Sequence, residues 1–118
     1  MTNTAATIAE SFSRHRFADA FPHLAADARW VAVGQATTHG RDAVVAACEA
    51  ATAELAGTEV EFVRFVSIAG PDAAAVDVVA RYVDPDGEVS VVSSCDIYEF
   101  RDGELVTITS YAVDLPTG

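Results

Sequence analysis

The sequence is poor in positive charge and in cysteine. It contains no lysine, and its 7 basic residues stand against 18 acidic ones, which gives a formal net charge of −11. Nucleic acids and anionic membranes attract basic surfaces, so this composition argues against both partners. The cysteines, Cys48 and Cys95, belong to no Cys-x-x-Cys motif and to no Cys/His cluster, and no glycine-rich phosphate loop is present. We therefore expect no metal and no other cofactor.

Long apolar runs and targeting signals are also lacking. The first residues, MTNTAATIAESF, contain no basic segment followed by an apolar one, so no signal peptide is expected. The longest apolar stretches are too short to cross a membrane. Hydrophobic residues make up 51% of the 118 residues, which is enough for one core, and we expect a single domain over residues 1–118. A cytoplasmic protein with free thiols is the expectation.

The first half of the chain has the periodicity of helices. Apolar residues at helical spacing predict helices over Thr4–His15, Phe17–Leu24 and Asp42–Ala56, the second of them shortened or bent by Pro22. A short strand is predicted over Arg29–Val33 and a loop over Gln35–Gly40.

After Gly57 the period changes to that of strands. Strands are predicted over Glu59–Ala69, Ala74–Val83, Glu88–Phe100 and Glu104–Val113, separated by the turn sequences GPD, DPDG and RDG. Three consecutive hairpins make an antiparallel meander. Helices gathered on one face of such a sheet make an α+β domain, with a cone-shaped cavity suited to a small apolar ligand.

One carboxylate stands out among the apolar residues of these strands. Strand alternation places Asp96 on the same face as Ser94, Tyr98 and Phe100. On the strand predicted over Ala74–Val83, alternate residues form an apolar face that includes Tyr82. Arg81 lies on the opposite face of that strand. On the last strand Ser110 and Asp114 share the inward face. These residues and Trp30 of the first strand are the predicted pocket lining, and Asp96 is the candidate catalytic residue.

The opposite face of the sheet is the predicted contact surface of a homodimer. Tyr111 falls on this convex side, where it would pack with Ile97 and Cys95.

Two stretches resemble the nuclear transport factor 2-like superfamily, which includes ketosteroid isomerases and SnoaL-like polyketide cyclases. They are THGRDAV, at the start of the long helix, and CDIYEFRDGELVTITSY, in the last hairpin. The resemblance covers nearly the whole chain. It implies a curved antiparallel sheet wrapped around helices, a cystatin-like α+β barrel. It implies isomerase, cyclase, hydrolase, dehydratase or purely binding functions, because the fold hosts all of these.

The resemblance transfers only in part to individual residues. Asp96 matches the isomerase acid of the penultimate strand, which an apolar site keeps protonated so that it donates a hydrogen bond to the substrate oxyanion. The isomerase base matches Ala32, which is no acid. The oxyanion tyrosine of the first helix is missing, because no tyrosine precedes Tyr82. An epoxide hydrolase would need an arginine in the pocket, and Arg81 is expected outside it.

Three functional hypotheses follow from these residues. The first is an isomerase or cyclase in which Asp96 serves as acid/base or as hydrogen-bond donor on an apolar carbonyl compound. The second is a binder or accessory dimer of the same fold without catalysis. The third is a dimerisation module whose pocket is collapsed and filled by Trp30 and phenylalanine side chains.

Overall fold

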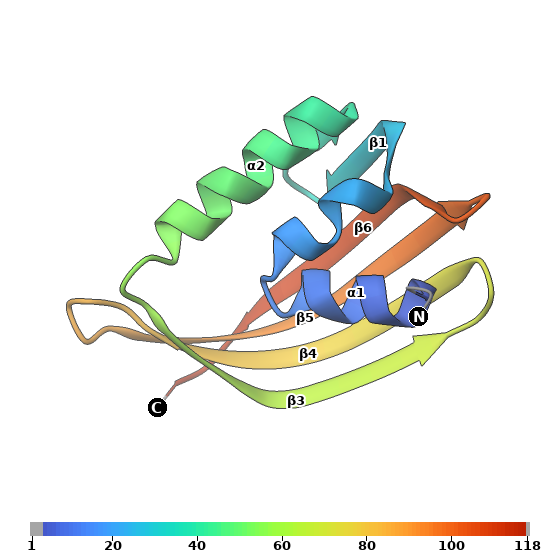
Figure 1. The fold of residues 1–118 in the computed structure, drawn as a ribbon. Helices are drawn as coiled ribbons and strands as arrows, with labels where there is room; N and C mark the ends of the chain where they lie inside the picture. Colours follow the sequence, from blue (N-terminus) through green and yellow to red (C-terminus); the bar gives the residue numbers. More distant parts are fainter. Residues whose placement is uncertain (1–3, 118) are drawn as a thin grey trace.

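The computed structural model describes residues 4–117 and has helices on one side of a curved sheet (Figure 1). Helix α1 spans Ala5–Ser13 and α2 spans Arg41–Glu54. The six strands are β1 Leu24–Ala32, β2 Thr37–His39, β3 Glu59–Ala69, β4 Ala73–Val83, β5 Val89–Arg101 and β6 Glu104–Leu115. They lie in the order β2-β1-β6-β5-β4-β3. The predicted α+β class and the three hairpins from β3 to β6 are confirmed.

The sheet is mixed rather than wholly antiparallel, which corrects the prediction. Strand β1 pairs with β6 in parallel, whereas every other pairing is antiparallel. The first strand also begins at Leu24, five residues before the predicted start, and the predicted loop contains the short strand β2. The predicted helix over Phe17–Leu24 is two 3₁₀ turns, Phe17–Asp19 and Phe21–His23. Pro22 lacks an amide hydrogen and prevents a continuous α-helix there.

The core lies between the helices and the concave face of the sheet. Alternate residues of β4 are buried, as strand periodicity requires, and Tyr98, Leu105 and Ile108 are buried on β5 and β6. Helix α1 adds Ile8 and Phe12. Arg81 is exposed, so the structure confirms that it lies outside the concave face. No helix within residues 4–117 is long and apolar enough to cross a membrane.

Two turns that contain residues with positive φ angles follow strand β5 and helix α2. Asp102 and Gly103 both have positive φ angles, 52° and 81°, the conformation that a tight two-residue hairpin turn requires. Gly57 has a φ of 78° and follows the last turn of α2, where Thr58 donates its amide hydrogen to the carbonyl of Leu55. The Asp-Gly dipeptide and Gly57 thus fix the directions in which the chain leaves β5 and α2.

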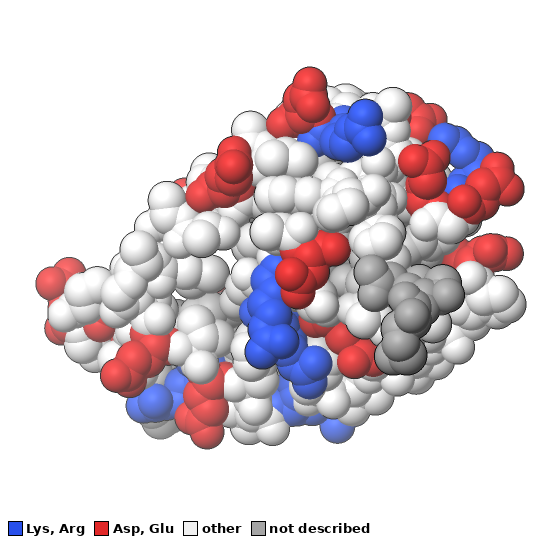
Figure 2. Space-filling model, in the orientation of Figure 1, with Lys and Arg blue, Asp and Glu red and all other residues white. Residues whose placement is uncertain are grey.

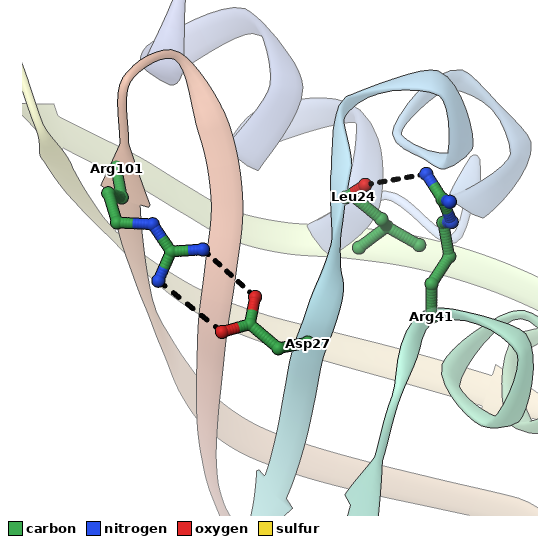
Figure 3. Close-up of polar contacts among 4 residues, drawn as sticks. All are labelled: Leu24, Asp27, Arg41 and Arg101. Atoms are coloured by element: carbon green, nitrogen blue, oxygen red, sulfur yellow. Dashed lines mark hydrogen bonds and ion pairs between the residues drawn. The ribbon is translucent and has the colours of Figure 1, made fainter.

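Two arginines hold the irregular part of β1, where its register against β6 shifts between Leu24 and Arg29. The guanidinium of Arg101 donates to both carboxylate oxygens of Asp27, at 2.9 and 3.4 Å (Figure 3). Arg41, the first residue of α2, donates to the carbonyl of Leu24 at 3.3 Å. The ion pair lowers the pKa of Asp27 through its hydrogen bond with Arg101. Both contacts tie β1 to its neighbours at the point where the strand ladder is interrupted.

Leu105 tests the importance of the β1–β6 junction. Its side chain is fully buried between Leu24 and Phe100, its strand neighbours. We expect Leu105→Ala to lower the free energy of unfolding by about 2–5 kcal/mol, because it leaves a cavity in the core. The half-exposed Val33 (44%) is the matched control, and Val33→Ala should cost only about 0.5 kcal/mol. Urea denaturation followed by circular dichroism measures both values; equal costs would contradict this placement of the core.

Candidate functional site

A cavity of about 350 Å³ lies between the concave face of the sheet and the two helices. This volume is near the lower end of the range for small-molecule sites. Its lining is mostly apolar and contains a few polar groups, and it comprises Phe12, His15, Phe17, Trp30, Ala51, Glu54, Leu55, Tyr82, Val92, Ser94, Asp96, Ser110, Tyr111 and Ala112. A cavity of this volume does not fit the hypothesis of a collapsed pocket.

Aromatic rings form one wall of the cavity instead of filling it. The ring of Phe12 stands edge-on to Phe17 and Trp30, with centroid distances of 4.8 and 5.2 Å. The indole Nε1 of Trp30 donates a hydrogen bond of 2.9 Å to Ser110 Oγ on β6, which fixes the indole plane against the sheet. Ser110 uses its oxygen in this contact, so its own hydroxyl hydrogen remains available to a ligand.

Asp96 is half-buried, and two hydroxyl groups form hydrogen bonds with its carboxylate. Ser13, the last residue of α1, donates to Asp96 Oδ2 at 2.8 Å, and the Tyr98 hydroxyl lies 3.4 Å from the same oxygen. Ser13 Oγ and Tyr98 Oη are themselves only 2.6 Å apart. Burial and the nearby Asp96 raise the pKa of Tyr98 well above its ordinary value, so this hydroxyl keeps its proton. Both contacts with the carboxylate are made to Oδ2, whereas the third contact joins the two hydroxyls to each other.

The structure brings together five of the seven residues that the sequence proposed for the site. Trp30, Tyr82, Ser94, Asp96 and Ser110 all line the cavity. Tyr98 is fully buried beneath Asp96 and supports the carboxylate without lining the cavity. Asp114 is exposed near the end of β6 and is not part of the lining. Tyr98 is covered because α1 packs on it, with the ring centroid of Phe12 at 5.8 Å. Asp114 lies in the exposed last part of β6.

His15 is a cavity residue that the sequence did not single out. It lies two residues after the end of α1, beyond the C-cap residue Arg14, and has a left-handed backbone, with φ 66°. Its ring lies against Phe17, Phe62 and Tyr82 at centroid distances of 5.7–6.0 Å. Its Nε2 is 3.5 Å from the Tyr82 hydroxyl. Burial lowers the pKa of His15, while the negative charge of Asp96 opposes this shift, so the imidazole is neutral at pH 7.

The thiols and the other ligand-type side chains form no second site. Cys48 is fully buried in α2, and burial raises its pKa to about 12, which makes it an inert core thiol. Within residues 4–117, no group of three or more His, Cys, Asp or Glu side chains is placed to hold a metal ion. The chemistry that this cavity can support is therefore hydrogen bonding and proton transfer by Asp96, His15, Tyr82 and the two serines.

Residues 5–108 match the model of the SnoaL-like domain. This chain belongs to the SnoaL-like domain family. Its members share the nuclear transport factor 2-like fold, as the sequence resemblance predicted. No match was found among functionally curated proteins.

Several solved structures share the SnoaL-like fold. A nuclear transport factor 2-like protein of unknown function from Cytophaga hutchinsonii is 27% identical, with a TM-score of 0.79 over 91% of this chain and 94% of that one. A candidate polyketide cyclase from Xanthomonas campestris is 18% identical, with a TM-score of 0.69 over 88% and 83% of the two chains. An epoxide hydrolase from M. tuberculosis, similar to limonene epoxide hydrolases, is 17% identical, with a TM-score of 0.66 over 92% and 82%. At these identities the last two establish the fold alone.

The electrostatic link between Asp96 and His15 can be measured directly. We expect the pKa of His15 to lie below its ordinary value of 6.5 and to fall further in Asp96→Asn, because the variant removes the charge that favours the imidazolium. The exposed Asp114 provides the control, and Asp114→Asn should leave the His15 titration unchanged. Proton NMR of the imidazole between pH 4 and 8 gives the three curves, and an unchanged pKa in Asp96→Asn would contradict the link.

The lowered pKa of His15 also predicts how the stability of the protein depends on pH. The unfolded chain binds a proton at His15 more readily than the folded chain does, because the folded pKa is lowered. This residue therefore lowers stability as pH falls through 6.5 towards the folded pKa, and its effect is absent above 6.5. His15→Gln should make the unfolding free energy less dependent on pH in this window, measured by urea denaturation at several pH values; an equally steep dependence would contradict the prediction.

Proposed function

We propose that this SnoaL-like protein acts on an apolar carbonyl compound and that Asp96 moves a proton at the carbon next to the carbonyl. The observation that carries the proposal is a half-buried carboxylate in an otherwise largely apolar cavity, oriented on one oxygen by Ser13 and Tyr98. In the proposed step the carbon–hydrogen bond breaks and a new O–H bond forms on Asp96. The electron pair moves into the enolate, whose charge rests on the carbonyl oxygen. Where a double bond is conjugated with the enolate, return of the proton from Asp96 to another carbon gives an isomer. Attack of the enolate carbon on a second carbonyl gives a ring, and the alkoxide formed there takes the proton back from Asp96.

The size and lining of the cavity define the substrate class. A cavity of about 350 Å³ suits a molecule of one or two rings. Phe12, Phe17 and Trp30 offer flat apolar surface to such a ring, and the Ser94 and Ser110 hydroxyls offer hydrogen bonds to its oxygens. Bicyclic ketones and short polyketide-like diketones combine these properties.

A binder without catalysis is the second candidate, and the absence of a carboxylate at position 32 favours it. Ala32 occupies the place where the isomerases that the sequence resembles carry their base. In a binder, Asp96 would be an acceptor for a ligand hydroxyl, and turnover would be absent.

The convex side of the sheet is the proposed contact surface of a homodimer. Exposed apolar side chains gather on strands β3, β5 and β6: Ile68 (71%), Ile97 (38%), Tyr111 (47%) and Val113 (62%). Tyr111 is paired with Cys95 on the neighbouring strand. A second copy would cover this face, since large apolar patches on a sheet are rarely left in water.

Partners other than a small molecule and a second copy are not proposed. The face in Figure 2 carries scattered acidic residues, and its basic residues lie beside them rather than in an extended patch. Nucleic acids and anionic membranes bind such surfaces poorly. The free thiols of Cys48 and Cys95 suit a reducing compartment, so the proposed location is the cytoplasm.

Asp96→Asn distinguishes the enzyme from the binder. Exchange of the α-hydrogens of 1-tetralone for deuterium, followed by NMR, measures proton transfer directly. We expect the native protein to accelerate the exchange and Asp96→Asn to abolish this acceleration, while ketone affinity changes less than about tenfold, the worth of one modest hydrogen bond. Asp114→Asn is the matched control and should exchange at the native rate. If the native protein binds the ketone without accelerating exchange, the binder is the correct reading.

Val113→Glu tests the dimer. A charge placed in a buried apolar interface is costly, so we expect this variant to be monomeric where the native protein is dimeric. Ala50→Glu, on an exposed position of α2, is the control and should remain a dimer. Light scattering coupled to size-exclusion chromatography gives the masses. A monomeric native protein, or a dimeric Val113→Glu, would exclude this interface.

A further inference from the structure

The cavity has a second polar group of residues, which can donate hydrogen bonds, whereas the Asp96 carboxylate accepts them. It is made by His15, at the end of α1, and Tyr82, near the end of β4, with Nε2 and Oη 3.5 Å apart. Both side chains line the same cavity as Asp96. The first helix carries no tyrosine, and neither His15 nor Tyr82 has a role in the proton transfer proposed for Asp96. The pair is therefore unexplained by the proposed function.

The structure holds His15 in place at some conformational cost. Left-handed backbone is uncommon for residues other than glycine, because the side chain strains it. At His15 this conformation, with φ 66°, directs the ring between Phe17 and Phe62, where it meets Tyr82. A glycine here would end the helix with less strain but would place no group against the Tyr82 hydroxyl. The ring contacts on both sides therefore orient the imidazole toward that hydroxyl.

Burial keeps both members of the pair neutral, although charged and titratable groups lie around them. Asp96 faces them from β5, and Glu54 lies on the same cavity wall from α2. On their own segment, Arg14 is directed away, with its guanidinium 3.9 Å above the ring of Phe65. Burial lowers the pKa of His15, and burial together with Asp96 raises the pKa of Tyr82. A neutral imidazole next to a protonated phenol is an arrangement that donates hydrogen bonds without carrying charge.

We propose that Tyr82, oriented by His15, is the hydrogen-bond donor to the carbonyl oxygen of the bound ligand. With its proton on Nε2, His15 donates to Tyr82 Oη, and the phenolic hydrogen of Tyr82 then points to the ligand. When Asp96 removes the α-hydrogen, negative charge develops on the carbonyl oxygen, and this donor stabilises it. Tyr82 contacts the substrate and is a catalytic residue in this scheme, whereas His15 is a positioning residue. The inference rests on the proposed carbonyl ligand and adds the group that recognises its oxygen.

Binding of a ketone and its matching hydrocarbon tests the donor without any need for turnover. 1-Tetralone and tetralin differ in the carbonyl group and have nearly the same shape. We expect the native protein to bind 1-tetralone about tenfold more tightly in calorimetry, and Tyr82→Phe to bind both equally. The infrared carbonyl stretch of bound 1-tetralone should lie at lower frequency in the native protein than in Tyr82→Phe. Ser93→Ala removes a hydroxyl from the opposite face of β5 and should leave both readouts unchanged.

Rescue at position 15 separates positioning from packing. The amide of His15→Gln can still donate to Tyr82, so this variant should keep most of the ketone preference and of the frequency shift. His15→Leu fills the space without a donor and should lose about three- to tenfold of the preference. These variants also decide the matter if Tyr82→Phe does not fold. Equal behaviour of the glutamine and leucine variants would overturn the role of His15.

The outcomes also separate this inference from the proposed function. A ketone preference that disappears in Tyr82→Phe supports the donor even if the native protein accelerates no hydrogen exchange. In that case only the proton transfer by Asp96 fails. Exchange that is accelerated by the native protein and whose kcat/KM is lowered about a hundredfold in Tyr82→Phe supports both. Exchange that is undiminished in Tyr82→Phe, or a native protein that binds tetralin as tightly as 1-tetralone, overturns the donor.

Discussion

The hydrogen bonds between Ser13, Tyr98 and Asp96 are the contact on which the site depends. They join the end of α1 to the middle of β5, across 83 and 85 positions of sequence. Because Tyr98 is fully buried and Ser13 nearly so, the hydroxyls cannot move to water without opening the core. A polar group in such a place must be paired, and here the pairing also sets the direction of the carboxylate. The same contact fixes where α1 ends, and therefore where His15 enters the cavity.

Around this contact, hydrogen-bond acceptors and hydrogen-bond donors lie at separate points of the cavity. Asp96 is an acceptor that can take up a proton, and it stands on the floor formed by β5. His15 and Tyr82 are neutral donors, held between aromatic rings at the side. Enzymes that move protons next to carbonyl groups need both kinds of group, at separate points of a largely apolar site. The aromatic wall formed by Phe12, Phe17 and Trp30 keeps water from a ligand lying between them.

Sequence reasoning predicted the meander and one face of the site because strand alternation is a strict rule. It placed Asp96, Ser94 and Tyr82 inside and Arg81 outside, and the structure agrees. It did not predict the parallel pairing of β1 with β6, because that pairing joins distant segments that no turn connects. It also missed His15, since neither a glycine nor an asparagine marks the left-handed residue after α1. Tyr98 was misplaced because alternation gives the face of a residue but not the depth at which a helix covers it.

The parallel pairing of β1 with β6 has a consequence for how the protein folds. Trp30 and Ser110 lie 80 positions apart, and Ser13 and Asp96 lie 83 apart, so these two polar contacts at the cavity wall each close a loop of most of the chain. Such contacts form slowly, because the entropy of closing the loop is lost before packing compensates for it. The hairpins from β3 to β6 join neighbouring segments and can form early. The cavity is then completed last, when the N-terminal segment docks on a sheet that already exists.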